Sequence, residues 1–218
     1  MTAPPEGPTG RRPIAVPLAA LVTVTGLAVT TVLGGFATAP EKPPKRLGQG
    51  STVDQEQFTT TFVGSRTVSE PGLFGGPAKR LLEIELLVVN KGEETAGTGV
   101  PYQEGHGGGS FGTSLLKVSP EIKGKYGASV FTPTGGGESS QLHPALPTSV
   151  VVRYELEDGQ RPPRQLTIDV GTYEWREGIT LAPGWFLVTK DGEGDEGGEK
   201  PVVTAQVTLP VMPGGTRS

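Results

Sequence analysis

Residues 80–89 read RLLEIELLVV, and this stretch decides the fold class of the chain. Its apolar side chains recur at every second position, which is the period of a β-strand rather than of a helix. The inward side of the strand is expected to carry Leu82, Ile84, Leu86 and Val88. Glu83 and Glu85 face outward, whereas Leu87 and Val89 make the end of the stretch apolar on both sides. A strand that is apolar on both faces is typical of the centre of a sheet.

The same alternation recurs in four other runs after residue 46. Shorter apolar runs at 115–118, 129–132 and 185–190 bring the expected total to about seven to nine strands. Proline and glycine separate the runs, which is typical of turns. We therefore predict an all-β fold, with two antiparallel sheets packed face to face as a β-sandwich. The expected inward-facing sets are Phe58, Thr60 and Phe62; Val150, Val152, Tyr154 and Leu156; Leu166, Ile168 and Val170; and Val203, Ala205, Val207 and Leu209.

An uncharged stretch from Pro13 to Pro40 precedes these strands. Read as a helix from Ile14 to Phe36, it would rise about 34 Å, enough to cross a hydrocarbon layer of about 30 Å. The alternative is a cleaved signal peptide, because Ala37-Thr38-Ala39 has the A-x-A form of a cleavage site. The apolar region is about twice the usual length for a signal peptide, and Pro40 follows the site. We therefore favour a retained transmembrane helix over residues 13–39, in contact with the lipid bilayer through residues 14–36.

The orientation of this helix depends on the basic residues that flank it. Arg11 and Arg12 abut its N-terminal end, whereas Lys42, Lys45 and Arg46 follow or lie within a proline-containing spacer. The positive-inside rule is nearly balanced between these two sets. We favour a C-terminal domain on the extracytoplasmic side of the cell membrane, and a cytoplasmic domain is the alternative. The expected organisation is a short cytoplasmic tail at 1–12, the anchor at 13–39, a Pro/Lys linker at 40–46, the β-sandwich at 47–213 and a disordered tail at 214–218.

The composition excludes several classes of function. The chain of 218 residues carries a net charge of −4, which gives no electrostatic basis for binding nucleic acid. Cysteine is absent, which excludes disulfides, thiol catalysis, cysteine metal sites and a lipid-modified cysteine. No strong motif places a pair of carboxylates for acid–base catalysis. We therefore expect neither an enzyme nor a bound cofactor.

One motif imitates a serine hydrolase. Residues 108–112 read Gly-Gly-Ser-Phe-Gly, a literal G-x-S-x-G, and His106 with the three following glycines imitates an oxyanion-hole signature. In a hydrolase the serine lies on a strand-to-helix turn and the glycine run belongs to a different loop. Here both fall in one glycine-rich segment, 91–112, which we expect to be a mobile loop. Only His143 follows Ser110 as a candidate base, so catalysis at Ser110 is the least favoured hypothesis.

An acidic segment near the C-terminus is a candidate calcium site. Asp191, Glu193 and Asp195 supply carboxylate oxygens, the ligands that calcium prefers. The spacing of an EF-hand is absent, because glycine does not occupy the position that this loop requires. The favoured alternative is a solvated hairpin tip. The two histidines, His106 and His143, lack neighbouring ligands in the sequence, so no zinc site is expected.

Four aromatic residues gather in one short stretch and form the candidate contact site. They are Tyr173, Trp175, Trp185 and Phe186. Tyr173 and Trp175 fall on the opposite parity from the preceding inward row, and a bulge at Gly171 would return them to the same face. An exposed group of this kind would suit a protein or glycan partner, since aromatic side chains supply large contact areas. Closure of the core, or pairing across a hairpin, is the favoured alternative.

Four segments resemble an Ig-like extracytoplasmic domain family. They are Leu47-Gly48-Gln49-Gly50; Phe58 to Val63; Leu82 to Val89, closing on Asn90-Lys91-Gly92; and Leu142-His143-Pro144 ahead of Val150 to Val152. This family occurs in bacterial lipoproteins and membrane-anchored surface proteins, and it includes an immunity lipoprotein that acts against phage superinfection. The resemblance covers residues 47–171. It implies an Ig-like β-sandwich outside the cytoplasm, and it implies no active-site residues. The chain departs from the family by its longer loop after Asn90 and its C-terminal portion with both tryptophans.

The sequence thus predicts a single-pass, membrane-anchored, extracytoplasmic binding or envelope-interaction module. A structural accessory subunit of a membrane transport or secretion complex is the alternative. An exposed patch at Trp175 and Trp185 would favour binding, whereas an apolar groove at the base of the helix would favour the accessory role.

Overall fold

The structure is a computed structural model, and it describes residues 43–72, 76–104, 108–122, 124–177, 182–191 and 199–216. The chain divides into two units, 1–42 and 43–218, and the described residues all belong to the second. The strands are β1 Lys45–Leu47, β2 Thr52–Asp54, β3 Phe58–Glu70, β4 Lys79–Asn90, β5 Ala96–Gly97, β6 Leu115–Ser119, β7 Gly124–Thr134, β8 Gly137–Ser139, β9 Gln141–Leu142, β10 Thr148–Leu156, β11 Gln165–Val170, β12 Tyr173–Arg176, β13 Gly184–Leu187, β14 Thr189–Asp191, β15 Glu199–Pro201 and β16 Ala205–Thr216. One 3₁₀ helix, η2, spans Phe111–Ser114.

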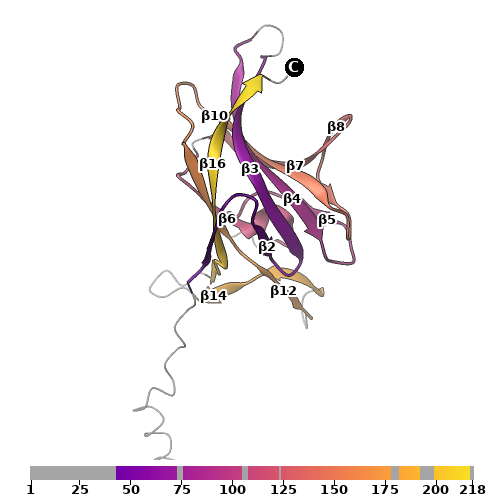
Figure 1. The fold of residues 1–218 in the computed structure, drawn as a ribbon. Helices are drawn as coiled ribbons and strands as arrows, with labels where there is room; N and C mark the ends of the chain where they lie inside the picture. Colours follow the sequence, from indigo (N-terminus) through magenta and orange to yellow (C-terminus); the bar gives the residue numbers. More distant parts are fainter. Residues whose placement is uncertain are drawn as a thin grey trace, which may run out of the picture. The chain divides into compact units, whose positions relative to one another are not determined.

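Ten of these strands form one sheet, so the predicted all-β class is confirmed. Its order is β6-β11-β16-β3-β4-β10-β7-β8, with β1 paired to β16 and β2 paired to β3. The strand that decided the fold class, β4, pairs on one side with β3 and on the other with β10. The prediction of a central strand is therefore confirmed. Figure 1 shows β3 and β4 running side by side within the sheet.

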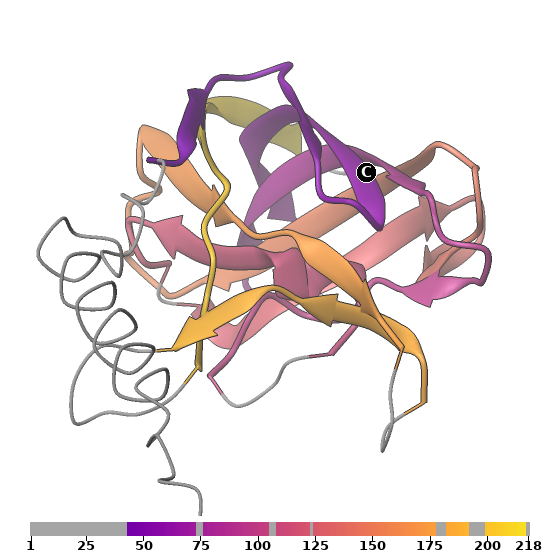
Figure 2. The ribbon, with the colours of Figure 1, turned by 90° about the horizontal axis from the view of Figure 1, so that it is seen from below.

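The sheet curls at its last strand, β16, which joins the two halves of the sheet. The first half of β16 pairs antiparallel with β11, and its second half pairs parallel with β3. β1 also pairs with β16 in parallel. The prediction that all pairings are antiparallel is therefore wrong for two ladders, which join segments at opposite ends of the chain. Figure 2 shows the resulting curl, with the two halves of the sheet facing each other across the interior.

The core fills the inside of this curl. Each predicted alternating run supplies buried side chains, and side chains from both halves belong to one cluster. Burial of such apolar surface is the main favourable contribution to folding. Val203 alone among the predicted inward residues is only partly buried. The confirmed inward residues are Phe58, Thr60, Phe62, Leu82, Ile84, Leu86, Val88, Val150, Val152, Tyr154, Leu156, Leu166, Ile168, Val170, Ala205, Val207 and Leu209.

The outer face of the sheet differs from the prediction at Glu83. This side chain lies on the predicted side but is 1% exposed, because two arginines from neighbouring strands cover it. Arg66 of β3 lies 3.3 Å and Arg153 of β10 lies 3.0 Å from its carboxylate. The Arg153 guanidinium also contacts Glu138 at 2.7 Å and lies 4.3 Å from the centre of the Phe131 ring. A charge that is paired in this way can be buried on an otherwise exposed face.

The ends of the β-domain extend slightly beyond the predicted boundaries. β1 begins at Lys45, within the predicted linker, and β16 runs to Thr216, within the predicted disordered tail. Both extensions arise from pairing, since Lys45 lies opposite Ala205 and Thr216 opposite Ser69. The predicted anchor at 13–39 falls outside the described residues. Across the described ranges, no helical segment has the length and apolar character that crossing a bilayer requires.

The chain turns a corner between β11 and β12, where the sequence predicts a bulge. β11 ends at Val170 and β12 begins at Tyr173 in a separate two-stranded sheet with β13. The irregularity in the large sheet falls one step earlier, where the β11–β6 register shifts between Asp169 and Val170. A Cβ at Gly171 would lie 3.1 Å from Leu187, so the corner favours glycine. This corner carries the aromatic residues to one end of the fold.

Candidate functional site

The β12–β13 hairpin determines where the four predicted aromatic residues lie. Tyr173 lies opposite Leu187, and Trp175 lies opposite Trp185. Side chains alternate between the faces of a strand, so these two pairs share one face of the hairpin. Phe186 pairs with Glu174 and belongs to the other face. The hairpin therefore separates the four residues into three environments.

Tyr173 belongs to the core and is 1% exposed, so it does not form part of a contact surface. Its ring lies edge-on to Phe58 with centroids 5.5 Å apart, and Phe58 packs in the same manner on Phe111. Its hydroxyl donates a hydrogen bond of 2.5 Å to the carbonyl of Ser110. Burial raises the pKa of Tyr173 far above its usual value. The core alternative is thus correct for this residue.

Trp175 and Trp185 lie further out along the same face. Their ring centroids are 5.6 Å apart with an interplanar angle of 73°, an edge-to-face arrangement. Trp175 is 52% exposed, and Trp185 is partly buried. An indole that exposes half of its surface while a second ring holds it in place is preorganised for contact. For these two residues the contact role stays a prediction.

Phe186 points to the opposite side of the hairpin. The guanidinium of Arg176 lies 5.6 Å from the centre of its ring, and Arg176 also pairs with Glu174 at 2.6 Å. Phe186 therefore cannot extend the tryptophan surface, although it remains partly exposed. It supplies a matched control for substitutions on the tryptophan side.

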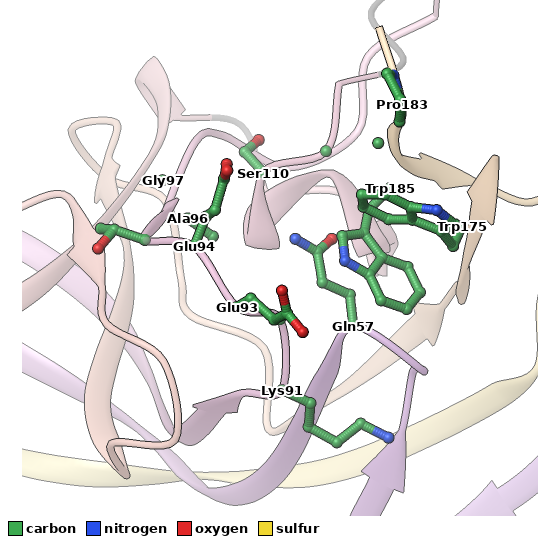
Figure 3. A pocket seen from close by; sticks show the side chains of 14 residues that line it. Gln57, Lys91, Glu93, Glu94, Ala96, Gly97, Ser110, Trp175, Pro183 and Trp185 are labelled. Carbon is green, nitrogen blue, oxygen red and sulfur yellow. The ribbon is translucent and has the colours of Figure 1, made fainter. Parts of the chain in front are cut away.

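The two tryptophans line a cleft of about 670 Å³. This volume is within the range of small-molecule sites, about 300–1,000 Å³. Figure 3 shows the indole rings forming one wall and the segment from Lys91 to Gly97 forming the opposite wall. We call this feature the tryptophan cleft. Its lining residues are Gln57, Lys91, Gly92, Glu93, Glu94, Thr95, Ala96, Gly97, Gly109, Ser110, Trp175, Pro183, Gly184 and Trp185.

Two glycines of the 91–112 segment lie close to Trp185. A Cβ at Gly109 would lie 2.8 Å from the carbonyl oxygen of Trp185, which is too close for a real side chain. A Cβ at Gly92 would lie 3.5 Å from the indole nitrogen of Trp185 and 3.1 Å from Asn90 Oδ1. The glycine-rich segment that the sequence predicts as a mobile loop therefore packs closely against the backbone of β13 at Gly109. It also carries the β5 strand and η2.

Asn90 shapes the wall opposite the tryptophans. Its amide nitrogen donates to the carbonyls of Glu94 at 2.7 Å and Leu142 at 3.0 Å. Its Oδ1 accepts from the backbone N–H of Gly92 at 2.9 Å, which is the geometry of an Asx turn. All of the polar groups of this side chain are used in fixing the loop. Glu93 and Glu94 are held at the cleft as a result.

Gln57 lies at the floor of the cleft, and its side chain is nearly inaccessible. The residue is 6% exposed, and its Oε1 atom forms no hydrogen bond within the described part of the chain. Figure 3 shows the Gln57 amide beside the indole rings, pointing into the space in front of the 91–97 wall. A buried acceptor without a donor costs about 1–3 kcal/mol. Such atoms are uncommon in folded proteins and call for an explanation.

The charge of the tryptophan cleft is negative. Glu93 and Glu94 are exposed at its rim, and Figure 3 shows Glu93 directed toward Gln57 and the rings. Lys91 extends away from this space, and its Nζ lies 2.6 Å from Asp54. The hydrogen bond from Lys91 holds the pKa of Asp54 below its usual value of 3.8. The charge of Lys91 is therefore already matched by Asp54.

Within the described residues, the Ser110 hydroxyl forms no hydrogen bond to a histidine or a carboxylate. Its hydroxyl lies 2.9 Å from Thr113 Oγ1 at the start of η2. His143, the histidine that follows it in the sequence, instead contacts Thr95 through Nδ1 at 3.0 Å. A nucleophile needs a base within hydrogen-bond reach. His106, the other element of the imitated motif, lies outside the described residues.

The candidate calcium segment is largely outside the described residues. Asp191 ends β14, and Glu193 and Asp195 fall in the range that is not described. Among the described residues, no group of three or more acidic, histidine or cysteine side chains is arranged to hold a metal ion. The calcium hypothesis therefore stays a prediction.

The sequence patterns did not reveal Gln57, Glu93 and Glu94 as parts of the site. Gln57 directly precedes β3 and belongs to no sequence motif. The two glutamates occupy a loop whose shape depends on Asn90. The only available signal was the Asn90-Lys91-Gly92 turn, which places the two glutamates directly after a buried strand.

Comparison with protein-family models, curated proteins and solved structures gives no match to this chain.

Proposed function

We propose that this chain is a binding module, and that the tryptophan cleft is its binding site. The observation that carries this proposal is the pairing of a half-exposed Trp175 with a supporting Trp185, beside a buried Gln57 oxygen that has no hydrogen-bond partner among the described residues. Aromatic side chains dominate the energetics of many contact surfaces, because they bury large areas at low entropic cost. Exposed apolar surface beside polar residues is typical of interaction sites and ligand-binding grooves.

The proposal includes the location and the family likeness inferred from the sequence. Residues 14–36 would anchor the chain in the cell membrane, and the β-domain would lie outside the cytoplasm. The uncharged stretch from Pro13 to Pro40 supports the anchor. The curled β-sheet supports an Ig-like sandwich, together with the segments at 47–171 that resemble the extracytoplasmic family. Protease treatment of intact spheroplasts tests the location. We expect the protease to remove the β-domain and to leave residues 14–36 in the membrane fraction.

The experiment that tests the binding role is crosslinking and pulldown from intact membranes with the full-length chain. Wild type is compared with Trp175→Ala and Phe186→Ala. Trp175 is half exposed, so its truncation should remove contact area while leaving the fold intact. Phe186 lies on the opposite face of the same hairpin and serves as the control.

We expect the Trp175→Ala chain to lose a crosslinked species that wild type and Phe186→Ala both retain. Loss with Phe186→Ala alone would move the site to the other face of the hairpin. An identical set of crosslinked species from all three chains would refute the cleft as the site and favour the structural accessory role.

A further inference from the structure

The chemistry of the tryptophan cleft restricts its ligand further, an inference that rests on the proposed function. We infer that the cleft binds an organic cation, an ammonium or guanidinium group, between the indole rings and the carboxylates of Glu93 and Glu94. The inference combines three independent features of the cleft: its charge, its aromatic wall and its buried acceptor.

The first feature is the absence of a free cation among the described lining residues. Lys91 is the one basic side chain among them, and its Nζ is paired with Asp54 at 2.6 Å. Glu93 and Glu94 face the cleft from the opposite wall, and both are exposed. An anionic ligand would meet two like charges there and no unpaired opposite charge. A cationic ligand would meet two opposite charges.

The second feature is the orientation of the indoles. An edge-to-face pair directs the edge of one ring at the face of the other and leaves further ring faces available to a ligand. The face of tryptophan carries negative electrostatic potential and attracts ammonium and guanidinium groups. Pairs of aromatic rings beside a carboxylate are a recurrent way of recognising alkylated ammonium. A neutral ligand would gain the contact area without this electrostatic contribution.

The third feature is the Gln57 Oε1 atom, an acceptor without a donor among the described residues. The terminal torsion of glutamine has a broad energy profile, so the amide can turn its oxygen toward a donor entering the cleft. An ammonium or guanidinium group brings donors only and no acceptor. It would satisfy this oxygen and thereby recover part of the cost of its burial.

The cleft is larger than the cationic group alone. A volume of about 670 Å³ leaves room for an alkyl stem beside the tryptophans. The same chemistry is presented by a free small amine or guanidine and by a lysine or arginine side chain of a partner polypeptide. The experiment therefore compares both sources.

The test uses the full-length chain in a non-ionic detergent, since choline-type headgroups would themselves compete for the site. Both tryptophans of the chain line the cleft, so tryptophan fluorescence reports binding there directly. The probes are N-acetyl-arginine amide, its neutral isostere N-acetyl-citrulline amide, a Gly-Gly-Arg-Gly-Gly peptide, and a chitin trisaccharide as a neutral glycan. The arginine amide is expected to bind at least about tenfold more tightly than the citrulline amide.

Substitutions test whether the charge of the cleft, and not only its shape, contributes to binding. Glu93→Gln with Glu94→Gln should weaken binding of the arginine amide by about tenfold, whereas Glu174→Gln on the opposite hairpin face should leave it unchanged. Gln57→Leu removes the buried acceptor and should weaken it by about threefold or more. Binding should also weaken as salt is raised, because the recognised charges lie at the rim.

The outcomes distinguish this inference from the proposed function. Equal binding of the arginine and citrulline amides, or selective binding of the trisaccharide, would refute the inference that the ligand is a cation. Either result would still support the cleft as a binding site. If no probe changes the tryptophan fluorescence, the inference of a cationic ligand is refuted too. The crosslinking with Trp175→Ala then tests the proposed function by itself. Equal affinities for the arginine amide and the peptide would identify a free small cation as the source; tighter binding of the peptide would identify a polypeptide side chain.

Discussion

The hydroxyl of Tyr173 donates a 2.5 Å hydrogen bond to the carbonyl of Ser110, and this contact joins the β12 strand to a residue that lines the tryptophan cleft. Tyr173 begins the β12 strand that carries Trp175, and Ser110 lies at the end of the glycine-rich segment that accommodates Trp185. The cleft is therefore tied to the core beside Ser110. Substitutions at this junction should alter the cleft and the stability of the domain together.

The first prediction concerns that hydrogen bond. Tyr173→Phe keeps the ring packing on Phe58 but removes the donor, and it should lower the free energy of unfolding by about 1 kcal/mol. The loss is modest because Thr113 Oγ1 also donates to the Ser110 carbonyl, at 2.7 Å. Urea unfolding measures it. Tyr154→Phe is the control, since the Tyr154 hydroxyl forms no hydrogen bond with a described residue. Equal losses from both variants would contradict the role of the bond.

The second prediction concerns the close approach at Gly109. Gly109→Ala places a methyl group 2.8 Å from the Trp185 carbonyl, so the hairpin has to shift away. Gly108→Ala, at the neighbouring position, meets nothing within 4 Å. We expect the Gly109 variant to change the tryptophan emission and lower the unfolding midpoint, and the Gly108 variant to resemble wild type. Unchanged emission in Gly109→Ala would show that the close packing is not maintained in solution.

The third prediction concerns pH. The Lys91 hydrogen bond lowers the pKa of Asp54, so the pair stabilises the folded chain above the unfolded pKa and ceases to do so as pH falls through the folded value. Lys91→Met should move the Asp54 pKa up toward 3.8. An NMR titration of the Asp54 side chain measures the shift. A pKa that stays low in the Lys91 variant would assign its depression to another group.

The fourth prediction concerns the outer face of the sheet. Glu83→Ala leaves Arg153 without its buried partner and should lower stability by about 3 kcal/mol. Glu138→Ala removes the exposed partner of the same arginine and should lower it by less than about 1 kcal/mol. Chemical unfolding of both variants provides the comparison. A Glu83 variant no less stable than the Glu138 variant would mean that the buried pair adds nothing to the fold.

The strand pattern predicted which residues are buried far better than how the strands are connected. Alternation identified the inward faces of β3, β4 and β10, because side-chain direction in a strand is a local property. The parallel pairing of β16 with β3 was missed, since it joins Val211 to Ser65 and depends on how the whole chain curls. The burial of Glu83 was missed for the same reason: its partner Arg153 lies 70 residues away.

The candidate site was predicted in part. The sequence identified Trp175 and Trp185, because two tryptophans so close together on one predicted strand pair suggest a shared surface. It grouped Tyr173 with them correctly by parity, but the corner at residues 171–172 places one end of that face in the core and the other at the surface. Gln57 became part of the site only through the tertiary fold.

The most direct test of the binding role is a photo-crosslinking measurement at two positions of the full-length chain in intact membranes. A photoreactive residue replaces Pro183, which lines the tryptophan cleft, or Glu174, which lies on the opposite face of the hairpin. We predict an adduct from position 183 that disappears when Trp175→Ala is added, and none from position 174. An adduct from position 174 alone, or one from position 183 that persists without Trp175, would contradict the account.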